Sequence, residues 1–463
     1  MPASLTAAPT RPRALRLPAA GPWRLPPVAW AAAWQAEPGF CWLDHGGPDG
    51  AAGWSFLACR PAREWALPAG EALRALETEL AAWRPREGEP CAGGPPFRGG
   101  WLAVLGYDLG REIERIPARA TPDLPFPELY LARHEWVLAY EHRAGAWWVA
   151  GLAAGDEALR AEAERRLAQL PPPRDPGAPF EPPARAWRSN FAREEYEAAV
   201  RRALEYIAAG DVYQVNLSQR FEIPWAHGAW ELYRRLRGAS PASHAALVRV
   251  GAGRCVASIS PELLLRARGR EALTRPIKGT RPRGRSPAED AAFAAELEGS
   301  AKDRAELNMI VDLERNDLGR LCEFGSVEVA SPGELERHPT VFHRVATVRG
   351  RLRERVGAGE ILRAVFPGGS VTGAPKIRAM QLIEELEPTR RGPYCGAIGW
   401  FGAGGDLELN LAIRTALADE ASGRAWFQAG GGIVADSDPR AEYEETLAKA
   451  AAFFRAANAR PMP

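Results

Sequence analysis

The chain has 463 residues, 46% of them hydrophobic, and its 59 basic and 58 acidic residues leave a net charge of +1. This length allows one large domain or two to three ordinary ones with a substantial core. The charge balance argues against a nucleic-acid-binding or membrane-surface protein, and the absence of any apolar run of about 20 residues argues against a membrane-spanning helix.

The start of the chain and its cysteines bear on cellular location. Residues 1–27 are rich in Ala, Pro and Arg and lack the apolar core of a signal peptide, so they predict a partly ordered start, with a transit peptide as the alternative. The cysteines are scattered without a C-x-x-C pair, which indicates reduced thiols and a cytoplasmic protein. They are Cys41, Cys59, Cys91, Cys255, Cys322 and Cys395.

A proline-rich segment divides the chain. Residues 1–170 predict strands at Trp101–Tyr107 and Trp136–Tyr140 and amphipathic helices at Glu71–Trp83 and Asp156–Leu170, a mixture typical of an α+β part. Residues 171–187 are interpreted as a stiff, extended connector. Residues 188–456 form the second part.

The second part opens with a helix and a strand. Ser189 predicts the N-cap of a helix with an apolar stripe from Tyr196 to Ile207, and Gly210 predicts its end. The following strand alternates, and its polar face carries Gln214, Asn216, Ser218 and Arg220. Such a face is typical of a solvent-exposed strand; the alternative is that it lines a cleft.

Glu262 and Lys278 flank a predicted β-hairpin. If the hairpin turns near Gly269, antiparallel pairing places Glu262 opposite roughly residue 276, close to Lys278. A lysine sheltered from water loses its proton more easily and can act as a nucleophile. The pair therefore predicts either a structural ion pair or a general acid beside a nucleophile.

Two predicted helices carry carboxylates. Ser300 and Asp303 have the spacing of a capping box at the start of a helix that contains Glu306. Ser437-Asp438-Pro439 predicts the start of a helix on which Glu442 and Glu445 share one face. Each set of carboxylates can face water, or the two helices can converge to form a Mg²⁺ site.

Two glycine-rich stretches offer backbone N–H groups for an anion. They are Pro367–Lys376 and Gly430–Gly432, and the first lacks the Gly-Lys-Ser/Thr ending of a phosphate loop. A carboxylate ligand fits better, with Arg414 as a bidentate clamp or, alternatively, as a core-edge salt bridge. His343 lies among apolar residues as a structural or binding residue, and no His/Cys cluster has zinc spacing.

Several long runs in one order resemble the chorismate-utilising family, which includes anthranilate synthase component I, isochorismate synthase and aminodeoxychorismate synthase component I. The runs include YQVNLSQRF, ISPELLL, PIKGTRPRG, KDRAELNMIVDLERNDLGR, PGGSVTGAPKIRAM, CGAIGW, LAIRT and AGGGIVADSDPRAEYEET. They cover nearly all of the second part, and FRGGWLAVLGYDLGREIE in residues 1–170 resembles the family more loosely.

Two positions distinguish the members. Isochorismate synthases have a water-activating lysine where this chain has Gln214, and anthranilate synthases usually have alanine where it has Lys278. The resemblance therefore implies the aminodeoxychorismate synthase reaction of p-aminobenzoate and folate biosynthesis. Lys278 would attack carbon 2 of chorismate, and ammonia would then displace it by entering at carbon 4.

The resemblance also implies residue roles. Glu262 would protonate the leaving hydroxyl, and Mg²⁺ would be the cofactor. The implied metal ligands are Glu306 and Glu445, with Glu442 nearby; the implied substrate contacts are Arg414, Gly430, Gly431, Gly432, His343, Ser370, Lys376 and Gln214.

The fold implied is α+β, with two related halves forming a large antiparallel β-sandwich flanked by helices and the active site in the cleft between them. Because no glutaminase motif is present, a separate glutamine amidotransferase subunit is expected to supply ammonia. Anthranilate synthase component I is the alternative enzyme. A chorismate-binding protein without catalysis is a further alternative, because Trp400 stands where relatives commonly have a tyrosine that can reach the substrate and the run Ser240–His244 is unusual.

Overall fold

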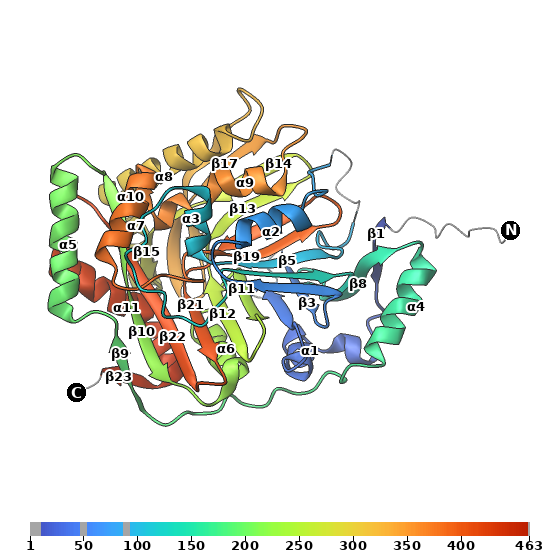
Figure 1. Ribbon diagram of the computed structural model, residues 1–463. Helices are drawn as coiled ribbons and strands as arrows, with labels where there is room; N and C mark the ends of the chain where they lie inside the picture. The colour runs from blue at the N-terminus through green and yellow to red at the C-terminus, as the bar shows by residue number, and fades with distance from the viewer. Residues whose placement is uncertain (1–10, 47–52, 87–92, 462–463) are drawn as a thin grey trace.

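The computed structural model describes residues 11–46, 53–86 and 93–461. Two large antiparallel sheets of 13 and 10 strands pack face to face at the centre of the molecule (Figure 1), which confirms the α+β sandwich. Within the described residues, no helix is both long enough and apolar enough to cross a membrane.

The larger sheet has strands from both parts of the chain. In spatial order they are β1 (Arg11–Arg16), β8 (Ala146–Ala153), β7 (Trp136–Glu141), β3 (Trp54–Ala58), β2 (Cys41–Asp44), β11 (His244–Arg249), β12 (Arg254–Ser260), β21 (Thr415–Asp419), β22 (Arg424–Ile433), β10 (Gln214–Pro224), β9 (Arg185–Ser189) and β23 (Ala459–Pro461), with β18 (Gly373–Ala374) beside β10. The two parts meet where β2 pairs with β11, with Leu43 opposite Ala246.

The smaller sheet also combines strands from both parts of the chain. Its order is β15 (Ile277–Pro282), β17 (Val341–Arg351), β14 (Glu271–Arg275), β13 (Leu263–Arg268), β20 (Leu407–Leu411), β19 (Ala397–Gly402), β5 (Gly100–Leu105), β6 (Leu129–His134) and β4 (Arg63–Leu67), with β16 (Glu328–Arg337) beside β17. Here the parts meet where β5 pairs with β19, with Val104 opposite Ile398.

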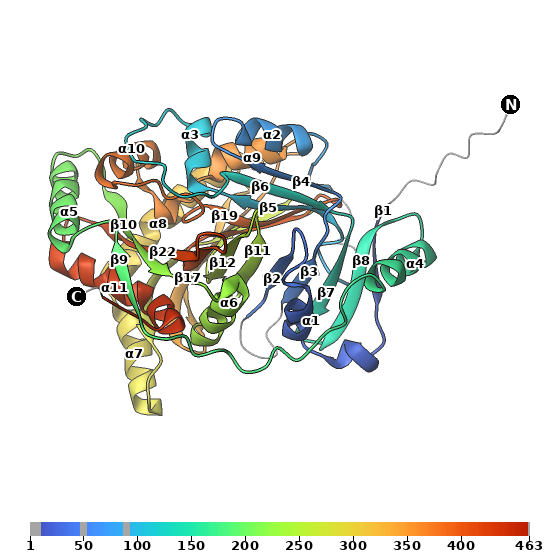
Figure 2. The same ribbon diagram turned by 60° about the horizontal axis from the view of Figure 1, so that its bottom comes forward.

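Helices cover the outer face of each sheet. The helices are α1 (Pro27–Trp34), α2 (Ala72–Glu79), α3 (Gly110–Ile113), α4 (Asp156–Leu167), α5 (Arg193–Ala208), α6 (Gly228–Ala239), α7 (Pro287–Gly299), α8 (Ala301–Gly319), α9 (Ala358–Val365), α10 (Lys376–Leu386) and α11 (Pro439–Ala457), with 3-10 turns η1 (Gly21–Arg24), η2 (Tyr107–Leu109) and η3 (Gly369–Val371). Figure 2 shows α1, α6 and α11 on one outer side and α2 and α9 on the other.

Alternation along β5 explains this layering. Leu102 and Val104 point into the core between the sheets, where they join Val248 and Val256 of the larger sheet. Leu105, on the opposite face, packs with α2, α8 and α9. The larger sheet packs its outer face on α1, α4, α6 and α11 in the same way. Successive side chains of a strand point to opposite faces, so a strand covered on both sides is apolar throughout.

Most of the predicted elements are confirmed. Strands β5 and β7 and helices α2 and α4 occupy their predicted positions, and Ser300 and Asp438 cap α8 and α11 by accepting a backbone N–H. Residues 171–184 form no helix or strand. Residues 11–16 form β1, so within the predicted partly ordered start this segment is an ordered strand, and residues 1–10 lie outside the described residues.

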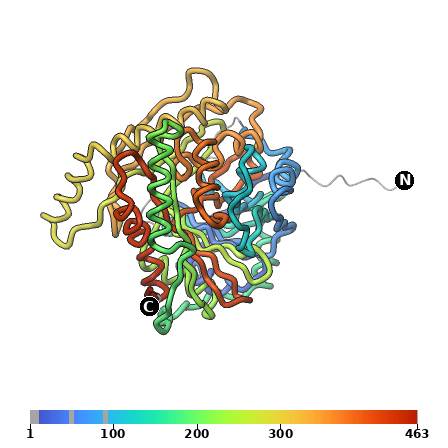
Figure 3. The backbone as a smooth tube through the Cα atoms, turned by 60° about the vertical axis from the view of Figure 1, so that its left-hand side comes forward, coloured from blue at the N-terminus to red at the C-terminus, as the bar shows by residue number. Residues whose placement is uncertain are grey.

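Ser189 is not the cap of α5. It ends β9, where its hydroxyl donates to Gln219 and accepts the N–H of Phe191. The N-cap residue is Ala192, whose N–H is bound by the Glu195 carboxylate. A capping hydroxyl reaches only the N–H groups two or three residues ahead, so a cap predicted three residues too early cannot cap the helix. Gly210 does follow the helix, with φ of 82°. Figure 3 shows α5 beside α11, which it contacts.

Five cysteines are described, and all five are buried and unpaired. Cys91 lies outside the described residues.

Candidate active site

A cleft of about 820 Å³ lies between the two sheets. The cleft opens at the point where β21 separates from β22. The pairing of these strands ends at Ala416 and Phe427, and Arg414, with φ of 50°, turns the chain away from β22. Ten of the thirteen predicted site residues line this cleft: Glu262, Lys278, Glu306, His343, Ser370, Arg414, Gly430, Gly432, Glu442 and Glu445. Residues distant in sequence thus meet at one place.

The β13–β14 hairpin brings Glu262 near Lys278. Leu263 pairs with Arg275, and a bulge between Leu263 and Arg266 shifts the register by one residue. Continuing this pairing places Glu262 opposite Pro276, as the sequence predicts. Lys278 follows two residues later in β15.

The surroundings of these two side chains favour acid and nucleophile chemistry. Glu262 is 5% exposed, and Ser370 Oγ donates to its Oε1 at 2.6 Å. Burial raises the pKa of Glu262 to about 7, against the lowering effects of Ser370 and Lys278. Burial also lowers the pKa of Lys278, while Glu306 opposes that shift. Near neutral pH, the carboxyl therefore retains a proton to give, and the amine loses its proton more readily than in water.

Helices α8 and α11 deliver three carboxylates to the cleft. Ser437 Oγ donates to Glu442 Oε1 at 2.6 Å, and Lys449 Nζ lies 2.6 Å from Glu445 Oε1. Burial raises the pKa of Glu306, and the Glu445 charge adds to this shift. Burial acts in the same direction on Glu445, but the Lys449 ammonium outweighs it and lowers the pKa of that carboxyl.

Gly431 makes room for these carboxylates. A Cβ at this position would lie 2.9 Å from Glu442 Oε2 and 3.4 Å from Glu445 Oε1.

Within the described residues, no group of three or more His, Cys, Asp or Glu side chains forms a complete metal cage. A pair of carboxylates completed by waters and an anionic ligand is nevertheless the type of site that Mg²⁺ uses, so Glu306 and Glu445 fit this ion.

Two glycine amides on β22 face the cleft. Asn216 N–H donates to Thr372 O at 2.8 Å and Ser218 N–H to Glu387 Oε1 at 2.9 Å, so both point away from β22. Their cross-strand partners are Gly432 and Gly430. In an antiparallel ladder, the amides of such pairs point outward. The N–H groups of Gly430 and Gly432 are therefore directed toward the cleft, near Arg414.

His343 stands at another wall of the cleft. Its Nδ1 lies 3.0 Å from Thr280 Oγ1, and burial lowers its pKa to about 3, with help from His338 and Arg414. The imidazole is therefore neutral near pH 7 and acts as a hydrogen-bonding group rather than as an acid.

Three predicted residues do not line the cleft. Gly431 faces the carboxylates, and Lys376 Nζ binds Asp317 Oδ2 at 2.6 Å. Gln214 is fully buried behind Gly432, and its side-chain amide has no hydrogen-bond partner within the described part of the chain.

The polar face of β10 is buried rather than solvent-exposed, and of its predicted residues only Asn216 lines the cleft. Glu387 accepts the Ser218 hydroxyl, and Arg391 binds Glu387 and the Asn216 carbonyl.

Trp400 is also away from the cleft. It stacks on Phe97 at 4.9 Å and packs against Phe56 in the core. A tyrosine hydroxyl at this position would not reach a ligand in the cleft, so the expectation that Trp400 removes a substrate contact is wrong. Ser240, by contrast, does line the cleft.

Lys449 and Tyr394 are two of the cleft residues that the sequence reasoning missed. Lys449 Nζ donates to Gly430 O at 2.8 Å, besides its ion pair with Glu445. The i, i+4 spacing of Glu445 and Lys449 on α11 could have revealed this lysine. Tyr394 lies in an irregular segment between α10 and β19, where no periodic pattern marks it.

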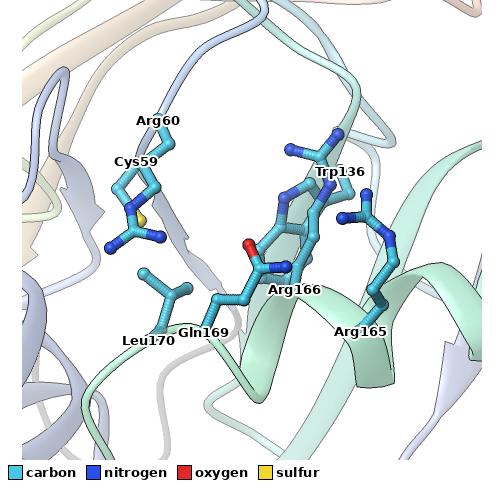
Figure 4. Close-up of a pocket in the computed structure, with 7 residues that line it drawn as sticks. All are labelled: Cys59, Arg60, Trp136, Arg165, Arg166, Gln169 and Leu170. Atoms are coloured by element: carbon cyan, nitrogen blue, oxygen red, sulfur yellow. The ribbon is translucent and has the colours of Figure 1, made fainter.

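A second cavity of about 270 Å³ lies over the end of α4 (Figure 4). Its lining includes Arg60, Arg165 and Arg166, but each of these arginines pairs with a carboxylate, Glu37 in the first case and Glu162 in the other two. Because each arginine has a carboxylate partner and none of the predicted residues is present, this cavity is not the candidate active site.

Comparisons with known proteins agree with this geometry. The family model described as chorismate binding enzyme matches residues 50–455. Aminodeoxychorismate synthase component 1 of Klebsiella aerogenes is 44% identical over 354 residues, or 76% of each chain. Anthranilate synthase component 1 of Thermus thermophilus is 44% identical over 389 residues, or 83% of this chain and 82% of its own.

Solved structures share the fold. The crystal structure of anthranilate synthase component I from Streptococcus pneumoniae superposes with a TM-score of 0.75 at 32% identity, covering 87% of this chain and 92% of that one. The isochorismate synthase MenF from Escherichia coli superposes with a TM-score of 0.73 at 17% identity, covering 97% and 95%.

Proposed function

The chain belongs to the chorismate-binding enzyme family, and we propose that it is the synthase component that converts chorismate and ammonia into 4-amino-4-deoxychorismate. The observation that carries the proposal is Lys278, an amine inside the cleft with a carboxyl of raised pKa beside it. A reaction that uses a lysine nucleophile gives this side chain a role at that position.

The proposed reaction has two displacements. The neutral Lys278 amine forms a C–N bond to carbon 2, both ring double bonds shift, and the carbon-4 hydroxyl leaves as water with the proton of Glu262. Ammonia then bonds to carbon 4, both double bonds shift back, and the lysine leaves from carbon 2 as the neutral amine. Glu262 regains its proton from the new ammonium group. The net change exchanges a hydroxyl for an amine and retains the enolpyruvyl group.

The other cleft residues bind and orient the substrate. Arg414 and the amides of Gly430 and Gly432 converge on the enolpyruvyl carboxylate, where charge-assisted hydrogen bonds hold it. The second, ring carboxylate faces Glu306 and Glu445. Bound Mg²⁺ would offset two of the three negative charges of these carboxylates and fix the ring against Lys278.

The ammonia source is part of the proposal. Relatives named "component 1" imply a second component, and we assign to it a glutamine amidotransferase that delivers ammonia. The pathway would be p-aminobenzoate and folate synthesis in the cytoplasm, a location consistent with the five described cysteines, which are free thiols.

Anthranilate synthase component I is the second candidate, because relatives of that name reach the same identity. The two reactions differ in their products, since anthranilate formation releases pyruvate, whereas aminodeoxychorismate retains the enolpyruvyl group.

The test is incubation with chorismate, ammonium and Mg²⁺, followed by mass analysis of the product and of the intact protein. Aminodeoxychorismate with a lysine adduct supports the proposal. Anthranilate with stoichiometric pyruvate would establish the second candidate instead.

A further inference from the structure

A second buried carboxyl lies beneath the cleft, on the same helix as Glu306. Glu314 follows two turns later on α8 and is 4% exposed. Thr274 Oγ1 donates to Glu314 Oε2 at 2.9 Å. Glu314 does not line the cleft, and the proposed reaction leaves it without a role.

Glu314 lies at the junction of α8, β14 and η3. Thr274 belongs to β14 and precedes Lys278 by four residues, so this hydrogen bond ties α8 to the strand that leads to the nucleophile. On another side lies η3. A Cβ on Gly369 would lie 2.5 Å from Leu313 Cδ2 and 3.7 Å from Glu314 Oε1, so η3 packs directly on α8 at this carboxyl.

The turn η3 continues to the general acid. Ser370 follows Gly369 and donates to Glu262 at 2.6 Å. A displacement of Glu314 would therefore shift Lys278 through β14 and Glu262 through η3. Glu306 stands two turns away on the same helix. Glu314 thus accepts a hydrogen bond from β14 and lies beside η3, the supports of the two reacting groups.

Burial and the nearby carboxylates keep Glu314 protonated. Asp317 faces it from its own helix, Lys376 from the start of α10, and Glu262 from the segment before β13. Lys376 is already paired with Asp317 at 2.6 Å. Burial and Asp317 raise the pKa of Glu314 to about 8, while Lys376 and Thr274 lower it. A protonated carboxyl can both donate and accept a hydrogen bond, whereas its ionised form would place an unpaired charge in the core.

We propose that Glu314 is a positioning residue that works as a neutral acid. Its protonated carboxyl holds the strand leading to Lys278 and the Ser370 turn against α8, and its ionisation separates the acid from the nucleophile. The Asp317–Lys376 pair completes the arrangement by fixing α8 to α10, which gives Lys376 a role outside the cleft. This inference rests on the proposed roles of Lys278 and Glu262.

The test compares the wild type with Glu314→Gln, which stays neutral at every pH. Chorismate consumption is measured at saturation between pH 6 and 9.5. Because Lys278 and Glu262 titrate in both proteins, the ratio of wild-type to variant kcat isolates Glu314. We expect a ratio within about threefold of 1 at pH 7, falling to about one tenth of that value at pH 9, one unit above the pKa of about 8.

Two further variants complete the design. Thr274→Val removes the hydroxyl and should lower kcat about fivefold, the effect of one lost hydrogen bond, with little change in the chorismate KM. Asp312→Asn is the matched control, since Asp312 lies on α8 with a side chain 71% exposed, and its ratio to wild type should not change with pH. A constant wild-type to Glu314→Gln ratio up to pH 9.5 would overturn the inference.

The outcome is separable from the identity of the product. Consumption of chorismate reports on Glu314 whichever product forms, so anthranilate formation with the expected ratio would refute only the proposed function.

A second measurement, of unfolding, needs no turnover. The raised pKa makes the wild type lose unfolding free energy as pH rises from the ordinary value near 4.5 to about 8, and Glu314→Gln should lack this loss. An identical pH dependence of urea unfolding in both proteins would also refute the inference.

Discussion

Replacing Glu262 with glutamine should remove the general acid and leave the cleft intact. The glutamine oxygen can still accept the Ser370 hydroxyl that donates to Glu262 at 2.6 Å, so the chorismate KM should change by less than about threefold. A positioned general acid contributes about 10²–10⁴-fold, so kcat should fall by that factor, equivalent to about 3–5 kcal/mol in the barrier.

The pH dependence carries the sharper evidence. Burial raises the pKa of Glu262 to about 7, so the protonated fraction falls about tenfold per unit above that pH. Lys278 titrates in both proteins, so the ratio of wild-type to Glu262→Gln kcat should fall with the same slope. The assay is chromatography of the amino product with ammonium as the nitrogen source, between pH 6 and 9.

Glu231→Gln is a suitable control, because Glu231 is a buried carboxyl on α6 outside the cleft that accepts the Phe180 N–H at 2.6 Å. Its ratio to wild type should not depend on pH. If the Glu262→Gln ratio were flat above pH 7, Glu262 would not be the acid, and the two-step displacement would lose its leaving-group chemistry.

Three further outcomes are expected. Lys278→Ala should abolish the covalent adduct in the intact-protein mass and lower product formation more than Glu262→Gln does; an adduct in this variant would rule out Lys278 as the nucleophile. Arg414→Met should raise the chorismate KM about 10- to 150-fold, the equivalent of about 1.5–3 kcal/mol for charged hydrogen bonds, measured by steady-state kinetics. Removing Mg²⁺ with EDTA should stop turnover reversibly, and Glu306→Gln should raise the Mg²⁺ concentration for half-maximal activity at least about tenfold; an unchanged requirement would exclude Glu306 as a ligand.

The local chemistry of the site was readable from the sequence. Hairpin pairing placed Glu262 near Lys278, and capping signals at Ser300 and Asp438 located the helices that carry the carboxylates. These inferences depend on interactions between residues close in sequence, which spacing records well. The family resemblance supplied what spacing cannot, namely that α8 and α11 converge on one cleft.

The contacts that the sequence did not reveal join distant segments. The polar face of β10 was predicted to face solvent or a cleft; Asn216 lines the cleft, whereas Glu387 and Arg391 from the segment after α10 cover Ser218 within the core. Lys376 was assigned to the substrate by the family resemblance, and in the structure its ammonium pairs with Asp317 on α8, which is 59 residues away in sequence. An amphipathic pattern shows that a polar group needs a partner but does not identify that partner.

The strand order of the larger sheet also has a consequence for how the newly made protein folds. β21 and β22 (Thr415–Ile433) lie at its middle, between β12 and β10, although they are made near the end of synthesis. Until they emerge from the ribosome, β12 and β10 present unpaired edges that can recruit other chains. Because the pairings of β12 with β21 and of β10 with β22 join segments far apart in sequence, we expect folding to be slow.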